Sequence, residues 1–231
     1  MVNNDYAFQK LIDEGYEFKF KQYLKDGFEL FKKEMGSFVG FYAALFGIFF
    51  VVGLILGEYS GLVTNLIQPA LTAGALLVAN DILLKKKPEF SRFFDGFKFF
   101  LPLLLLGIVS SLLIVVGLLF LIIPGIYLAV GYSFGHMFVV FLGYDYWTAM
   151  ELSRKIISKK WFEFFLFFLL LILINVGGIL ACGIGVIFTA PITLCMTYCA
   201  FEDIVGGAIR KYQLVENKPE QIEQIEPIKN E

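Results

Sequence analysis

Four polar side chains lie within or beside the long apolar stretches of this chain and are the best placed to do chemistry. His136 is the only histidine, and it lies inside an apolar stretch. Ionisable groups in hydrocarbon are energetically unfavourable, so such a residue is a candidate for relaying protons or binding a ligand. The small neighbours Gly131, Ser133 and Gly135 equally favour a neutral histidine that hydrogen-bonds to an adjacent helix. Both interpretations of His136 stay open.

The other three candidates are aspartates that share one position in the sequence. Asp81, Asp145 and Asp203 each end an apolar stretch, and a glycine precedes each of them by 20 residues: Gly61, Gly125 and Gly183. Three equivalent carboxylates could form a ring that binds or gates cations. Alternatively, each carboxylate stays hydrated at a boundary or pairs with a basic residue that follows it, such as Lys85 or Arg210. The sequence leaves both interpretations open.

Metal and nucleophilic chemistry are not indicated by the remaining residues. Cys195 and Cys199 are four residues apart, but a single histidine and no second cysteine pair leave too few soft ligands for a zinc site. The one Gly-x-Ser-x-Gly stretch, Gly131–Gly135, lies inside an apolar stretch rather than between a strand and a helix, and the chain has no phosphate-binding loop. We therefore expect no cofactor, no metal and no enzymatic activity. Four amides within or at the ends of apolar stretches are explained by hydrogen bonds between helices: Asn65, Gln68, Asn80 and Asn175.

The elements that position these residues are predicted to be transmembrane helices. The chain is 58% hydrophobic and 17% charged, which is far more apolar than a soluble domain. A bilayer core requires about 20 apolar residues per helix, and six stretches meet this length. They cover about 37–57, 61–81, 99–121, 125–145, 161–181 and 183–203, within a membrane domain of residues 37–207.

The basic residues predict the orientation of these spans. All 19 Lys and Arg residues lie before the first span, in the two longer connections, or in the polar tail of residues 208–231. The three tight connections on the other face carry one charged residue, Glu58. Because basic residues are retained on the cytoplasmic side, both termini are expected there, in a bacterial inner membrane. The basic residues form no continuous face, so no nucleic-acid partner is expected.

An internal repeat is the most specific pattern in the sequence. An amphipathic segment precedes each pair of spans, and these segments are Tyr23–Phe31, Arg92–Phe100 and Thr148–Ile156. Residues 1–36, which contain the first of these segments, are expected to form an amphipathic cytoplasmic segment. Phe, Tyr and Leu beside Lys and Arg are typical of interfacial helices. The predicted fold is all-α, with three repeats of an interfacial amphipathic helix and a transmembrane hairpin. These helices either cover the cytoplasmic ends of the bundle, or sense the membrane or generate its curvature.

Three stretches of the sequence resemble a known family. They are IPGIYLAVGYSFG (Ile123–Gly135), DYWTAMELSRKIISKKWFEF (Asp145–Phe164) and GIGVIFTAPITLCMTYCAFEDI (Gly183–Ile204). Over nearly its whole length, the chain resembles a family of uncharacterised six-span bacterial membrane proteins of the Bacteroidetes type. More distantly, it resembles the membrane domain of some glycerophosphodiester phosphodiesterases. Some family members are labelled beta-carotene monooxygenases, but those enzymes hold iron with several histidines, and this chain has only His136.

Two classes of function follow from these patterns. The first is a non-enzymatic membrane protein that organises or senses the membrane, or an accessory subunit of a larger complex. Its partners would be membrane lipids and a protein partner or a second copy of the chain. The second class is a transporter or channel for a lipid or other small molecule, because repeats and proline-interrupted helices such as those at Pro69 and Pro191 are common in transporters.

Overall fold

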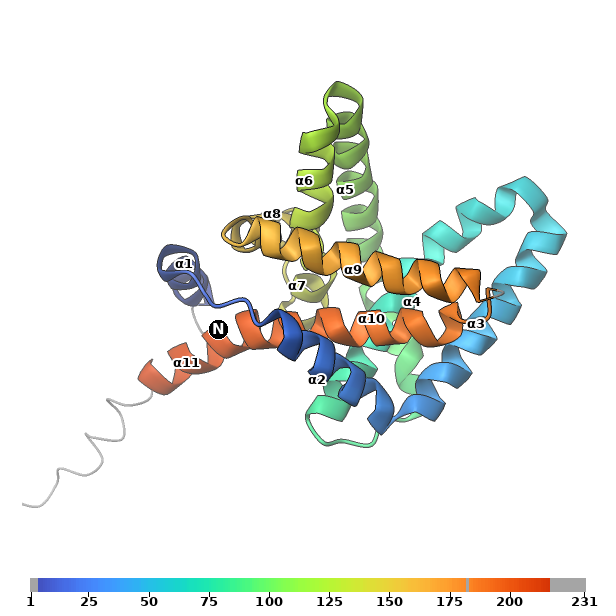
Figure 1. The fold of residues 1–231 in the computed structure, drawn as a ribbon, viewed down its shortest axis with the longest axis horizontal. Helices are drawn as coiled ribbons and strands as arrows, with labels where there is room; N and C mark the ends of the chain where they lie inside the picture. Colours follow the sequence, from blue (N-terminus) through green and yellow to red (C-terminus); the bar gives the residue numbers. More distant parts are fainter. Residues whose placement is uncertain (1–3, 182, 217–231) are drawn as a thin grey trace, which may run out of the picture.

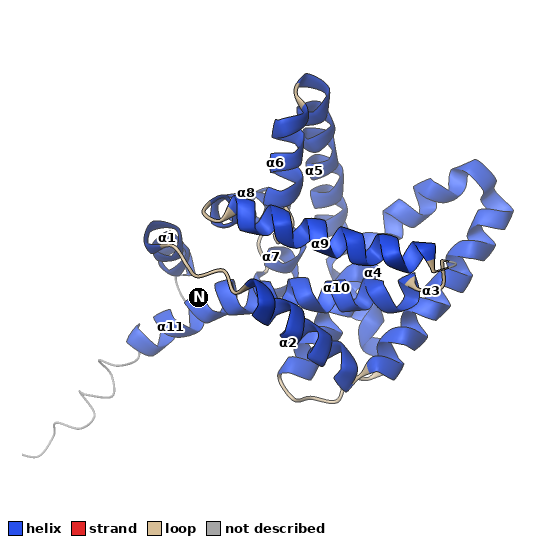
Figure 2. Ribbon diagram, in the orientation of Figure 1, coloured by secondary structure: helices blue, strands red, loops and turns tan. Residues whose placement is uncertain are grey.

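The elements of the structure are helices. The computed structural model describes residues 4–181 and 183–216, so Cys182 and residues 1–3 and 217–231 lie outside the described residues. Figure 2 shows the helical architecture of the described residues. In chain order the elements are α1 (Asn4–Glu14), α2 (Phe20–Lys33), α3 (Met35–Leu56), η1 (Gly57–Tyr59), α4 (Ser60–Leu83), η2 (Phe90–Phe99), α5 (Phe100–Phe120), α6 (Ile122–Gly131), α7 (Gly135–Leu142), α8 (Tyr146–Ser158), α9 (Trp161–Leu180), α10 (Val186–Phe201), η3 (Glu202–Gly206) and α11 (Gly207–Glu216).

Several of these helices are long and apolar enough to cross a membrane. Among the described residues, five helical stretches qualify: Met35–Leu83, Phe90–Phe120, Ile122–Leu142, Trp161–Leu180 and Val186–Tyr212. The first of them is 49 residues long and contains both α3 and α4, joined by η1. The prediction of an all-α membrane protein with several apolar helices is therefore confirmed.

The ends of the helices follow from local sequence. Gly57 ends α3 with a φ of +52°, and Gly143 ends α7 with a φ of +69°. Left-handed backbone conformations of this kind are adopted readily by glycine, which has no Cβ. By contrast, Pro69 and Pro191 lie inside α4 and α10 and end neither helix. The predicted tail begins as a helix, since α11 continues to Glu216.

Helix α4 is the centre of the packing. It contacts α3, α5, α7 and α10 as well as the shorter elements α2 and η2. The part of α4 after Pro69 contains several small, fully buried residues, namely Ala70, Ala73, Ala75 and Ala79, with Gly74 among them. Small residues let helix backbones approach closely, which is how helices associate without a hydrophobic driving force in lipid.

Three shorter elements, α2, η2 and α8, pack along the apolar helices and are called the surface elements below. Segment α2 packs mainly on α10, η2 packs mainly on α4, and α8 packs on α6 and α7. A Cβ atom on Gly27 would overlap the backbone of Met196, and one on Gly96 would overlap the carbonyl oxygen of Ala70. The predicted amphipathic segments thus lie within α2, η2 and α8, and η2 is a 3₁₀ helix rather than an α-helix.

The predicted span 125–145 is not one continuous helix. Residues 132–134 form a turn between α6 and α7, and α7 ends at Leu142. Ser153 of α8 compensates for this break. Its hydroxyl donates to the Gly131 carbonyl at 2.6 Å and accepts from the Phe134 amide at 3.1 Å. Because Ser153 is fully buried, this single side chain replaces the backbone hydrogen bonds that the helix loses there.

The apolar helices form three pairs (Figure 1). The pairs are α3 with α4, α5 with α6, and α9 with α10, and in each pair the two helices pack on each other. In the view of Figure 1, the connecting turns of the α3–α4 and α5–α6 pairs lie far apart. Helix α1 packs on α11 and α8, so the two described ends of the chain meet.

Candidate functional site

Asp81 lies near the end of α4 and pairs with η2. The Nε atom of Arg92 donates to the Asp81 carboxylate at 2.8 Å, and Nη1 of the same arginine donates to Asp95 at 2.8 Å. Lys98 also pairs with Asp95. Hydrogen bonds to these carboxylates raise the pKa of Arg92, and those from Lys98 and Arg92 lower the pKa of Asp95. The Asp81 side chain is 13% exposed, so it is the more buried member of the pair.

Asp203 lies in η3, a π-helical turn after α10, and pairs with the start of α2. Lys19 donates to one carboxylate oxygen at 3.0 Å, and the Tyr23 hydroxyl donates to the other at 2.9 Å. Burial raises the pKa of Tyr23, with a further contribution from Asp203, so the phenol remains a proton donor. The basic partner is therefore Lys19 rather than Arg210, which pairs with Glu202.

Asp145 is the N-cap of α8. Its side chain accepts hydrogen bonds from the backbone amides of Trp147 and Thr148 and from the Thr148 hydroxyl. An aspartate in this position satisfies amides that the first helical turn leaves without partners. These bonds, first of all that from the Thr148 hydroxyl, hold the pKa of Asp145 below its usual value.

The three aspartates therefore act in the same way at separate places. Each carboxylate binds the surface element that packs on its own apolar helix: η2 for Asp81, α8 for Asp145 and the start of α2 for Asp203. Within residues 4–181 and 183–216, no group of three or more His, Cys, Asp or Glu side chains is placed to hold a metal ion. Asp81 and Asp203 each pair with a basic side chain, whereas Asp145 caps α8.

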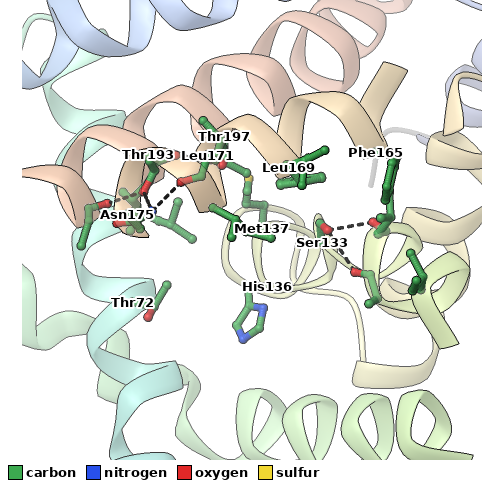
Figure 3. Close-up of a pocket in the computed structure, with 18 of the residues that line it drawn as sticks. Thr72, Ser133, His136, Met137, Phe165, Leu169, Leu171, Asn175, Thr193 and Thr197 are labelled. Carbon is green, nitrogen blue, oxygen red and sulfur yellow. Dashed lines mark hydrogen bonds between the residues drawn. The ribbon is translucent and has the colours of Figure 1, made fainter. Parts of the chain in front are cut away.

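His136 lies in α7 on the wall of a large cavity. This cavity has a volume of about 700 Å³ and is bounded by α3, α4, α6, α7, α9 and α10. Figure 3 shows Thr72 and His136 on one side of it and Asn175, Thr193 and Thr197 on the other. Most of the lining is apolar, with Leu, Ile, Phe and Ala side chains predominating. A large apolar cavity with a few polar groups is the usual form of a small-molecule site.

Two smaller cavities share walls with the large one. The first has a volume of about 580 Å³, lies toward α5 and includes Thr72, His136 and Ser111 in its lining. The second has a volume of about 440 Å³, lies between α3, α4 and α10 and includes Tyr42, Thr72 and Gln68. Thr72 lines all three cavities.

The predicted amide hydrogen bonds between helices are confirmed at two of four positions. Asn80 accepts from the Tyr198 hydroxyl at 2.8 Å, and Asn175 donates to the Thr193 hydroxyl at 3.0 Å. Asn65 instead donates to the Gly61 carbonyl of its own helix. Gln68 makes no hydrogen bond with the part of the chain that the structure describes.

Two functional positions were missed by reasoning from the sequence. Thr72 and Ser153 are single hydroxyls, one in an apolar stretch and the other in an amphipathic one, and neither position carries a motif. Comparisons with protein-family models, with curated proteins and with solved structures find no match for this chain.

Proposed function

We propose that this chain is a non-enzymatic, multi-pass membrane protein that binds a lipid or other apolar small molecule between its spans, in order to sense or to transport it. The observation that carries the proposal is the cavity of about 700 Å³, which is lined by side chains from six helices. Its volume lies within the range of roughly 300–1,000 Å³ typical of ligand sites. Its apolar lining matches a ligand that is already dissolved in the membrane.

The proposed topology has six spans with both termini in the cytoplasm of a bacterium. The spans are α3, α4, α5, the α6–α7 pair, α9 and α10. The orientation rests on the distribution of Lys and Arg, which are absent from the turns that join α3 to α4, α5 to α6 and α9 to α10. In this topology the cavity lies within the depth of the bilayer.

The proposed architecture consists of three repeats that interlock in a circle. Each surface element packs on the second helix of the preceding pair: η2 on α4, α8 on α6 and α7, and α2 on α10. The buried positions of α2 and α8 support this equivalence at a constant offset of 126 residues. The matching pairs are Tyr23 and Ala149, Gly27 and Ser153, Leu30 and Ile156, and Phe31 and Ile157. This offset differs by one residue from the frame in which Thr148 matches Tyr23.

Filling the cavity tests the proposed function. Ala129 and Ala44 are both exposed, but Ala129 lines the cavity, whereas Ala44 on α3 lines none of the described cavities. We would purify the wild type, Ala129→Trp and Ala44→Trp in lipid-preserving polymer particles and identify bound lipids by mass spectrometry. We expect one lipid class to be enriched over the bulk membrane in the wild type and Ala44→Trp, and to be lost from Ala129→Trp.

Two results would contradict this function. A lipid profile equal to that of the bulk membrane in all three proteins would exclude selective binding. A stoichiometric protein partner in all three preparations, without an enriched lipid, would instead support the organising or accessory role. Folding of Ala129→Trp is checked by its elution as a single species in size-exclusion chromatography.

A further inference from the structure

The three adjoining cavities contain polar side chains that lack protein partners. Thr72 lines all three cavities, His136 lines two, and Tyr42 and Gln68 each line two. None of these four side chains makes a hydrogen bond with the described residues. The contrast with nearby polar residues is clear, because Asn175 and Thr197 both donate hydrogen bonds to the protein.

Unpartnered polar groups at this depth indicate polar ligand atoms. Water is scarce in the bilayer core, and each unsatisfied polar group there costs several kcal/mol. Thr72 lies 11 residues before the end of α4 at Leu83, which places it about 17 Å from that end along the helix axis. A hydroxyl or carbonyl group of a bound molecule would satisfy Thr72 and His136 at the junction of the cavities.

The charge of the cavities constrains the ligand further. None of the residues that line the three cavities is Asp, Glu, Lys or Arg. A phosphate or carboxylate group placed there would lose its hydration without gaining a counter-charge, which is strongly unfavourable. The polar part of the ligand is therefore expected to be uncharged.

We propose that the site binds an uncharged amphiphile, with apolar chains in the cavity of about 700 Å³ and a hydroxyl or carbonyl head group against Thr72 and His136. This inference rests on the proposed function, because it names the class of ligand for the same cavity. It goes beyond that function by assigning the head-group contacts and by excluding anionic lipids.

A matched pair of lipids tests the inference. Dioleoylglycerol and dioleoylphosphatidic acid have the same chains and differ by one phosphate group. We would measure the binding of each to the purified full chain in detergent micelles by native mass spectrometry and by the shift of its thermal unfolding midpoint. We expect dioleoylglycerol to bind and to raise the midpoint, and dioleoylphosphatidic acid to do neither.

Variants of the head-group contacts complete the test. Thr72→Val keeps the shape of the side chain and removes its hydroxyl, and His136→Phe removes both ring nitrogens. Loss of one hydrogen bond is expected to weaken dioleoylglycerol binding by about fivefold to tenfold. The control is Ser110→Ala, since Ser110 precedes the cavity residue Ser111 on α5 and both hydroxyls bond to their own helix. Ser110→Ala should bind as the wild type does.

Each outcome has a distinct meaning. If both lipids bind equally and Ala129→Trp abolishes both, the uncharged class is wrong but the proposed function holds. If dioleoylglycerol binds equally well to the wild type, Thr72→Val and His136→Phe, the head-group assignment is wrong. If neither lipid binds and native purification enriches no lipid, the proposed function fails together with this inference.

Discussion

Replacing Ser153 with Ala removes the hydroxyl that bonds to both sides of the break between α6 and α7. The change leaves the Gly131 carbonyl and the Phe134 amide without their partner in a fully buried position. An unsatisfied buried donor or acceptor costs about 1–3 kcal/mol. The loss of both bonds is therefore expected to lower the free energy of unfolding by about 2–6 kcal/mol. That is a large part of the roughly 5–15 kcal/mol typical of a folded domain.

Equilibrium unfolding in mixed micelles measures this loss directly. The purified variant is titrated with increasing fractions of a denaturing detergent, and its helix content is followed by circular dichroism. Ser91→Ala is the matched control, because Ser91 is exposed on η2 and its hydroxyl lies 3.3 Å from the carboxylate of Glu89. Substituting an exposed side chain of this kind changes the free energy of unfolding by about 0.5 kcal/mol or less. Equal midpoints for Ser153→Ala and Ser91→Ala would refute the role of Ser153 in the broken span.

Three further predictions concern the surface elements, and the same titration tests them. Gly96→Ala should lower the free energy of unfolding by about 1–3 kcal/mol, because the new Cβ overlaps the Ala70 carbonyl. The control Gly47→Ala places its Cβ where nothing lies within 4 Å and should be neutral. Similar losses for both variants would contradict the close packing of η2 on α4. Tyr23→Phe should destabilise by about 1.5–3 kcal/mol through loss of its bond to a charged acceptor, and Tyr59→Phe, at a side chain that is 71% exposed, should not. Asp145→Ala should destabilise by about 0.5–2 kcal/mol at neutral pH. The pKa of Asp145 is lower in the folded state, so its contribution is present above its unfolded pKa of about 3.9 and is lost as the pH falls through the lower folded value. A difference between wild type and Asp145→Ala that stays constant down to pH 3 would exclude the capping role.

The apolar helices could be predicted from the sequence because their length and punctuation are local properties. A run of 22 residues such as Met35–Leu56 has no charged residue, and Gly57 ends it. The break at residues 132–134 could not be predicted in this way, since no proline marks it and its stability comes from Ser153 on another helix. Conversely, a proline need not mark a break, because α4 and α10 continue through Pro69 and Pro191.

The sequence suggested a basic partner that follows each aspartate, and only Asp81 has such a partner, because Lys19 precedes Asp203 and Asp145 caps α8. Local pairing at a helix end was one of the two interpretations of the sequence, and the nearest basic residues suggested Lys85 and Arg210. The observed partner of Asp203 is Lys19, which lies 184 positions away, and that of Asp81 is Arg92. Pairing over such a separation depends on α2 packing against α10, which no local pattern specifies.

The contact between α2 and α10 has a consequence for how the chain is made. Residues are synthesised from the N-terminus, so α2 leaves the ribosome more than 150 residues before α10 does. During this interval Gly27 lacks its close contact with the backbone of Met196 on α10. Arrival of α10 lets the face of α2 around Gly27 pack, and the Lys19–Asp203 ion pair joins the first part of the chain to the last. We therefore expect a product that stops before Val186 to leave this face of α2 without its α10 contacts and more sensitive to proteolysis.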